Sequence, residues 1–284
     1  MSVVSSAAML NAARKGKYAV GSFIVWGFDS AFAVAKAAEK YRQPVMMMIG
    51  ARDAEEYLGG YDNVRGLVDA VAKTVDVPIA LHADHFNNYD CIVKAIQGGF
   101  TSVMIDASKY PLEENIRLVK DVVKVAHAAN VSVEAELGRL PGNEGDEDVS
   151  LSEAFQTNPQ EAAYFVKQTG VDALAVAIGT MHGAYPPGVT PELNIELIKK
   201  LKASVPVPLV MHGGSGTPKD KFRAAIQAGI SKVNVATDLI TATAKKLAEI
   251  QTVPIRYNVE NTFYLGRAAC QEAVEEKIRL FAGL

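Results

Sequence analysis

The sequence predicts an α/β fold in which parallel strands alternate with helices and close into a barrel. Short apolar runs of strand length alternate with helical patterns about eight times along the 284 residues. Most of these runs are apolar throughout, as expected for strands buried on both faces. Polar residues gather where strands three to eight end. In a TIM (β/α)8 barrel those ends surround one mouth, whereas the alternative, a doubly wound open sheet, would spread them along an edge.

The first half of the barrel is expected at four apolar runs, each followed by a helix. The chain begins with a helix that ends near Gly16, and Asp29 is the expected N-cap of the next helix. Pro78 suits the beginning of a strand, because it cannot donate a backbone hydrogen bond. The expected strands are 19–26, 44–50, 77–85 and 102–108, and the helices that follow them are 31–41, 64–75, 89–98 and 112–130.

The second half repeats the alternation around one long polar insertion. Residues 139–157 are rich in Gly and acidic side chains and exceed an ordinary connector, which indicates a functional loop. A C-terminal helical extension completes what we expect to be a single barrel domain, 1–284. The expected strands are 131–138, 173–182, 208–214 and 232–238, and the helices are 159–169, 191–204 and 218–229.

The composition favours a small-molecule partner and excludes nucleic acid and membrane. The formal net charge is −3, and no cluster of Lys and Arg offers a footprint for phosphate backbones. No apolar run approaches the length of a membrane span, and the N-terminus lacks the pattern of a secretory signal. Cys91 and Cys270 show neither disulfide nor zinc-thiolate spacing, so we expect a cytoplasmic protein.

Three expected strands close on a histidine, namely His85, His182 and His212. One histidine at a strand end is more often structural than a ligand, but three in equivalent positions are expected to meet at the mouth. Three neutral imidazoles with an open fourth position form a catalytic zinc site, where substrate oxygen replaces water on a Lewis acid. His82 lies beside the first predicted ligand, and His127 lies within a helical pattern, as expected of a structural residue.

Asp84 directly precedes the first predicted ligand, at the end of its strand. Two roles fit this position equally well. The carboxylate could exchange a proton with a substrate hydroxyl while zinc polarises an adjacent carbonyl. It could instead orient a ligand histidine.

A glycine-rich turn follows the seventh expected strand and suggests a phosphate site. Backbone amides of Gly213 and Gly214, with the hydroxyls of Ser215 and Thr237, can hold a phosphate. TIM barrels often bind phosphate with the loops after strands seven and eight. Most short glycine-rich turns are only turns, but the place of this one beside His212 strengthens the prediction.

Several acidic residues are expected near the mouth. Strand alternation places Glu134 and Glu136 on one face, where buried carboxylates need a metal, another cation or hydrogen-bond donors. Asp106 lies on the neighbouring expected strand. The insertion carries further acids, of which most are expected simply to face solvent: Glu144, Asp146, Glu147 and Asp148.

Together these motifs resemble the class II (zinc-dependent) ketose-bisphosphate aldolases, a family that includes fructose- and tagatose-bisphosphate aldolases. The resemblance covers nearly the whole chain, and EAELGR with NVATDL looks closest to the tagatose type. The motifs occur in the family's order: YAVGSF, LHADH, GFTSVMIDAS, SVEAELGRLPG, VDALAVAIGTMHGAY, PLVMHGGSG and KVNVATDL.

The resemblance implies a role for each matching residue. His85, His182 and His212 would hold one catalytic Zn²⁺, and Asp84 would exchange a proton with the C4 hydroxyl. Asn234 would contact the dihydroxyacetone phosphate half near the cleaved bond. The phosphate of this half would be bound at Gly183, Gly213, Ser215 and Thr237.

The resemblance also implies a reversible retro-aldol cleavage of a ketose 1-phosphate or 1,6-bisphosphate. A second metal or monovalent cation would lie at Asp106 and Glu136, and Glu144 would exchange the proton at the nucleophilic carbon. Homodimers or tetramers are expected from the family.

Several positions depart from the family's pattern. Where many members have Asn, Gln and Ser near the substrate, this chain has Ile24, Met48 and Gly50. Pro186 replaces a lysine, Ala236 an aspartate, and Arg267 lies out of register with the usual C-terminal Arg-Lys. We therefore expect intact zinc and phosphate chemistry with a more apolar pocket for the remaining substrate. Alternatives are the same chemistry on a non-standard ketose phosphate, a non-catalytic accessory barrel and, less favoured, a zinc hydrolase.

Overall fold

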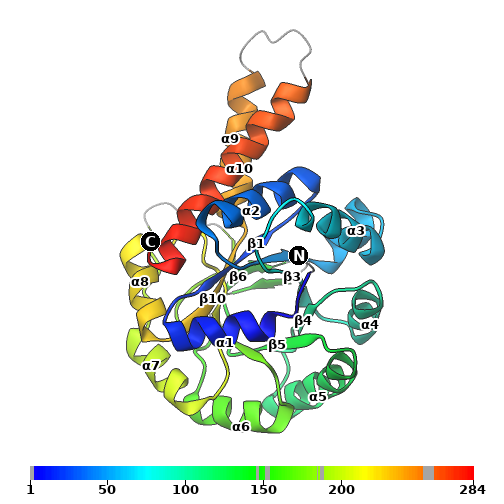
Figure 1. Cartoon of the computed structure of the whole chain (residues 1–284). Helices are drawn as coiled ribbons and strands as arrows, with labels where there is room; N and C mark the ends of the chain where they lie inside the picture. The colour runs from blue at the N-terminus through cyan, green and yellow to red at the C-terminus, as the bar shows by residue number, and fades with distance from the viewer. Residues whose placement is uncertain (1–2, 145–146, 151–153, 184, 186–188, 252–258) are drawn as a thin grey trace.

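Eight parallel strands close into a barrel, which confirms the predicted TIM barrel (Figure 1). The computed structural model describes residues 3–144, 147–150, 154–183, 185, 189–251 and 259–284, with the backbone alone at 143, 144, 147, 148, 251 and 259–261. The strand order around the barrel is β1-β10-β9-β8-β5-β4-β3-β2. The strands are β1 Val20–Ile24, β2 Val45–Ile49, β3 Ile79–Phe86, β4 Ser102–Ile105, β5 Ser132–Leu137, β8 Ala173–Val176, β9 Leu209–Met211 and β10 Ile230–Val235.

Helices surround the barrel, and several begin at residues that the sequence makes good caps. Asn88, Asn158 and Asn194 accept backbone hydrogen bonds at the starts of α4, α6 and α7. The described helices are α1 Ser6–Gly16, α2 Phe28–Tyr41, α3 Tyr61–Ala72, α4 Tyr89–Gln97, α5 Leu112–Ala128, α6 Pro159–Thr169, α7 Ile195–Ser204, α8 Lys219–Ala228, α9 Thr237–Gln251 and α10 Val259–Ala282, with the π-helical turn η1 Asp53–Tyr57. None of them is long and apolar enough to cross a membrane.

Some element boundaries differ from the predicted ones. The predicted N-cap at Asp29 is wrong: α2 begins at Phe28, because the side chain of Ser30 folds back onto the backbone of Gly27. The strand expected over 173–182 ends at Val176, since beyond it the backbone bonds with loops instead of with neighbouring strands. The insertion after β5 contains a hairpin of β6 Gly142–Glu144 and β7 Glu147–Val149.

The two ends of the barrel are closed differently. Helix α1 lies across one end, where Leu10 packs among interior residues such as Val20, Met46 and Val210. The other end carries the loops that follow the strands. Figure 1 shows α9 and α10 side by side, projecting from the barrel, and α10 continues back to pack against α2. The barrel core and these loops together position the candidate site.

Candidate metal centre and active site

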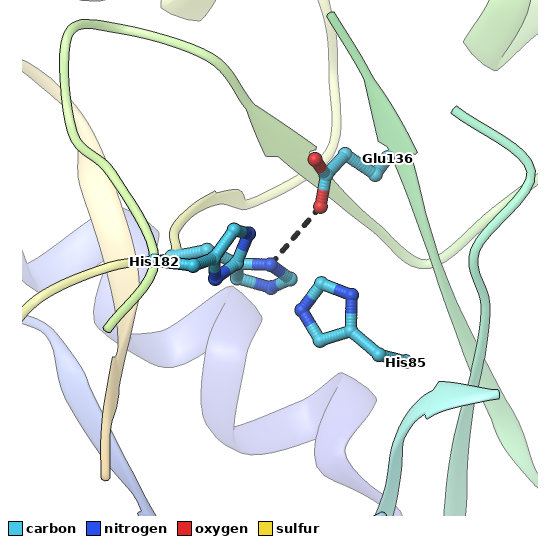
Figure 2. A group of neighbouring side chains, drawn as sticks. His85, Glu136 and His182 are labelled. Atoms are coloured by element: carbon cyan, nitrogen blue, oxygen red, sulfur yellow. Dashed lines mark ion pairs between the residues drawn. The ribbon is translucent and has the colours of Figure 1, made fainter. Parts of the chain in front are cut away.

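Three histidines that are far apart in the sequence converge at the mouth of the barrel. The ring centroids of His85 and His182 are 5.0 Å apart, those of His85 and His212 4.6 Å, and those of His182 and His212 6.0 Å. Glu136 of β5 approaches the same point (Figure 2). One ligand atom from each of these four residues lies within 4.8 Å of the others, which suits a metal ion.

A bulge in β3 brings two consecutive side chains to the site. Asp84 and His85 would face opposite sides of a regular strand. The register between β3 and β4 shifts between Ala83 and Phe86, and His85 has a φ of 51°. This left-handed backbone is costly for a residue other than glycine, and such conformations gather at functional sites. As a result Asp84 and His85 both line the cavities at the mouth.

His182 is held by a contact between two loops, because it lies well beyond the end of β8. Its backbone N–H donates to the carbonyl of Pro141 at 2.8 Å, and Gly142 forms a bridge with it. A Cβ on Gly142 would lie 2.3 Å from the carbonyl oxygen of His182, so only glycine permits this approach. The insertion after β5 therefore positions the second predicted ligand.

Neighbouring carboxylates determine which ring nitrogens face the metal position. Nδ1 of His85 lies 2.8 Å from Oδ2 of Asp106, which leaves Nε2 for a metal. Nε2 of His212 lies 2.9 Å from Oε1 of Glu134, which leaves Nδ1. Burial raises the pKa of Asp106, but the hydrogen bond with His85 outweighs it and holds that pKa well below its ordinary value.

The arrangement around His212 fits a bound cation. Its Nδ1 lies 3.0 Å from Oε2 of Glu136, yet neither buried atom forms a well-aligned hydrogen bond within the described part of the chain. Burial alone would lower the pKa of His212, but the carboxylates of Glu134 and Glu136 against its ring raise that pKa to about 9. Three imidazole nitrogens that leave a fourth position open are a donor set of catalytic Zn²⁺ sites, so His85, His182 and His212 fit this ion, with the carboxylate of Glu136 beside them.

Behind His212 lies a buried charged group that sequence reasoning missed. Lys232 of β10 is fully buried, and its Nζ lies 2.7 and 3.0 Å from the two carboxylate oxygens of Glu134. It also donates to Nε2 of His82 at 3.3 Å, so Nδ1 of that ring donates to Ser102 at 2.8 Å. The available signal was a lysine two residues before Asn234, in a strand that carries no other charged residue.

The contacts within this group determine the charge states of Glu134 and His82. Burial would raise the pKa of Glu134, but the charge of Lys232 and the hydrogen bond with His212 hold it well below the ordinary value. Burial lowers the pKa of His82, and the nearby charge of Lys232 lowers it further. Glu134 is therefore ionised and His82 neutral. His127 lies elsewhere, on α5, and contacts Asp172 at 2.8 Å.

Asp84 lies beside Asn234, and both line the small cavity that the three histidines border. Its Oδ1 accepts a hydrogen bond from Nδ2 of Asn234 at 3.0 Å, and the residue is 8% exposed. This bond orients the carboxylate, and Asp84 lines both cavities at the mouth of the barrel. The position therefore suits proton exchange with a bound hydroxyl.

A small cavity of about 100 Å³ adjoins the histidines on the side of the glycine-rich loop 213–216. Gly213 has a φ of 63°, and a Cβ there would lie 2.2 Å from the carbonyl oxygen of Met181. The cavity is lined by every residue predicted to hold the phosphate half: Gly183, Gly213, Gly214, Ser215, Asn234 and Thr237, with Met48 and Ala236.

A second cavity of about 370 Å³ shares Asp84, His85 and His182 with the first. Ile24 and Gly50 line it, as the departures from the family pattern suggested. Charged side chains line it too, so it is less apolar than expected; these include Arg52, Asp53, Lys109 and Arg139, together with Asp106 and Glu136. Glu144 lies in β6, and its side chain is outside the described residues, as is the whole of Pro186.

Comparisons with known proteins agree with this geometry. A family model described as "Fructose-bisphosphate aldolase class-II" matches residues 4–283. A fructose-bisphosphate aldolase from Geobacillus stearothermophilus is 39% identical over 99% of this chain and 97% of its own.

Two crystal structures are similar along nearly the whole chain. The YdjI aldolase from Escherichia coli K12 has a TM-score of 0.86 and 34% identity, covering 99% of this chain and 97% of its own. A putative fructose-1,6-biphosphate aldolase from Coccidioides immitis has a TM-score of 0.85 and 29% identity, covering 96% of this chain and 94% of its own.

Proposed function

Because this chain belongs to the class II fructose-bisphosphate aldolase family, we propose that it catalyses the zinc-dependent, reversible cleavage of a ketose 1-phosphate or 1,6-bisphosphate. The products would be dihydroxyacetone phosphate and an aldehyde. The observation that carries the proposal is the convergence of three imidazoles beside Asp84, whose carboxylate is oriented by Asn234.

Different residues bind the phosphate and transfer the proton. Backbone amides of loop 213–216, with the hydroxyls of Ser215 and Thr237, bind the C1 phosphate in the small cavity. Asp84 takes the proton of the C4 hydroxyl as the C3–C4 bond breaks and C4 becomes an aldehyde carbon. The electron pair passes to C3 and the adjoining C2 carbonyl. When bound, Zn²⁺ supplies a Lewis acid that draws electron density from that carbonyl.

Protonation of C3 completes the cleavage. Glu144 on the insertion is the residue that the family resemblance suggests for this step. Asn234 keeps Asp84 aligned in both directions of the reaction, and the aldehyde half occupies the larger cavity.

Three finer points belong to the same proposal. A second cation would bind between Asp106 and Glu136, which both line the larger cavity. The protein would form a homodimer or tetramer, as the family resemblance implies. The two free cysteines are consistent with a cytoplasmic location.

The test compares the wild type with Asp84→Ala, Asp84→Asn and a chelated sample. We expect chelation to abolish release of dihydroxyacetone phosphate and readdition of Zn²⁺ to restore it. Both variants should keep the metal and lose about 100-fold or more in kcat, the usual value of a positioned acid or base. Near wild-type turnover in Asp84→Ala would refute the assignment.

The substrate is identified with a panel of fructose, tagatose and less common ketose phosphates, with and without a second phosphate. A preference for a bisphosphate would show that the larger cavity binds a second anion. Metal binding without cleavage of any ketose phosphate would favour the accessory-barrel alternative.

A further inference from the structure

A cavity of about 640 Å³ lies between loop 213–216 and the two C-terminal helices. It shares Gly183, Ser215 and Thr237 with the small site cavity, so both cavities border the proposed phosphate position. Its far wall includes Asp238 of α9 and Lys277 of α10. Charged side chains of the projecting helices therefore lie directly behind the loop.

Asp238 holds this loop through its backbone and through its side chain. Its backbone N–H donates to Oγ of Ser215 at 3.2 Å, and its Oδ1 accepts from the N–H of Gly216 at 3.1 Å. Because Oγ of Ser215 accepts this hydrogen bond, its own proton is left to donate to an anion. The other carboxylate oxygen, Oδ2, lies 2.6 Å from Nζ of Lys277.

Lys277 is confined to this position. Its side chain is 12% exposed, and Nζ lies 5.1 Å from the ring centroid of Phe222 on α8. The neighbouring acid of α10, Glu276, is paired with Lys219 at 2.9 Å. Lys277 therefore balances the charge of Asp238 beside the position of a phosphate dianion.

We propose that Lys277 is a positioning residue for the phosphate group, acting through Asp238. Its ammonium neutralises the carboxylate that holds Gly216 and Ser215, so that this carboxylate fixes the loop without repelling the phosphate. The inference rests on the proposed function, because it takes loop 213–216 as the phosphate site. It extends that function by making α10 part of the binding apparatus.

The experiment uses the zinc-loaded full chain and inorganic phosphate as the probe. Lys277→Met keeps the packing on Phe222 and removes the charge, whereas Asp238→Asn keeps an acceptor for Gly216. The double variant has neither charge, and Lys40→Met is the matched control, because it removes a lysine that pairs with Glu275 of α10, away from the cavity. Phosphate affinity is measured by calorimetry, and KM and kcat are measured with the best substrate of the panel.

We expect Lys277→Met to weaken phosphate binding and raise KM about tenfold, as one unbalanced charge near the anion implies, with kcat within about twofold. The double variant should return to within about threefold of the wild type, because the two substitutions are coupled. A merely structural role would lower stability without this charge-dependent recovery.

Unchanged phosphate affinity and KM in Lys277→Met would overturn the inference, as would an equal change in Lys40→Met or no recovery in the double variant. If the proposed function itself were wrong, the experiment would give a different result. In that case the wild type would cleave no ketose phosphate, while Lys277→Met would still weaken the binding of inorganic phosphate and thereby support the inference.

Discussion

Nζ of Lys232 lies 2.7 Å from Oε2 of Glu134 in the barrel interior, and neither side chain exposes more than 2% of its surface. The two residues belong to β10 and β5, which are separated by β9 and β8 in the barrel, so the contact crosses the interior. Glu134 in turn faces Nε2 of His212. Lys232 is therefore connected, through Glu134, to the predicted metal ligand His212.

Removing the charge of Lys232 should weaken the metal centre. Lys232→Met leaves Glu134 buried without its cation, and we expect a loss of about 3–5 kcal/mol in the free energy of unfolding. We also expect about 10- to 100-fold weaker metal binding, as for other residues that orient a ligand histidine. Chelator competition measures the affinity and chemical denaturation the stability.

Lys200→Met provides the control, because Lys200 is exposed on α7. Glu134→Gln keeps the shape of the side chain and should weaken metal binding as well. If Lys232→Met bound metal as tightly as the wild type, the link through Glu134 would be wrong.

Metal binding should release a proton from His212. In the metal-free protein its pKa is raised to about 9 from the ordinary 6.5, and a metal ligand must be neutral. Affinity should therefore fall about tenfold for each pH unit below 9. Calorimetry near neutral pH, in buffers with different ionisation heats, should show about one proton released per ion. Buffer-independent heats would contradict this expectation.

The same shift predicts how the stability of the chelated protein depends on pH. A raised pKa means that the folded state binds the proton more tightly, so this contribution is complete below pH 6.5 and is lost as the pH rises through 9. Thermal unfolding of the chelated protein should show the decline. His212→Asn should remove this part of the pH dependence.

Gly213→Ala should disrupt the mouth of the barrel. The φ of 63° and the 2.2 Å approach to the carbonyl oxygen of Met181 leave no room for a methyl group. We expect a stability loss of at least about 1–3 kcal/mol, together with weaker phosphate binding. Gly66→Ala in α3 is the control, since an added methyl there meets no atom within 4 Å and should stabilise the helix by about 0.5–1 kcal/mol. Equal stabilities in the two variants would contradict the expectation.

A cluster of three hydroxyls attaches α1 to the barrel. Oγ of Ser6 lies 2.7 Å from that of Ser132 and 3.1 Å from that of Ser102, all of them buried. Ser6→Ala should cost about 1–3 kcal/mol, because it removes two buried hydrogen bonds of about 0.5–1.5 kcal/mol each, and kcat should not change. Ser204→Ala, at the half-buried last residue of α7, should stay within about 0.5 kcal/mol of the wild type. Denaturation curves of the wild type and both variants, recorded at one pH, measure these changes in the free energy of unfolding.

The alternation of strands and helices, the barrel and the three histidines were predictable from the sequence. These features depend on local patterns: apolar runs define buried strands, and the motifs around His85, His182 and His212 each lie within a few residues. The helix starts at Asn88 and Asn158 also follow from local capping chemistry. The tertiary structure was needed wherever a side chain depends on a partner distant in the sequence.

Only the tertiary structure showed that Lys232 pairs with Glu134 across the barrel, because no local pattern specifies which buried charges meet. The ring nitrogens of His85 and His212 that face the metal position likewise depend on carboxylates from other strands. The bulge that brings Asp84 and His85 to the same side depends on the register between β3 and β4. Residue types and their order thus determined what chemistry the site holds, whereas long-range packing decided its geometry.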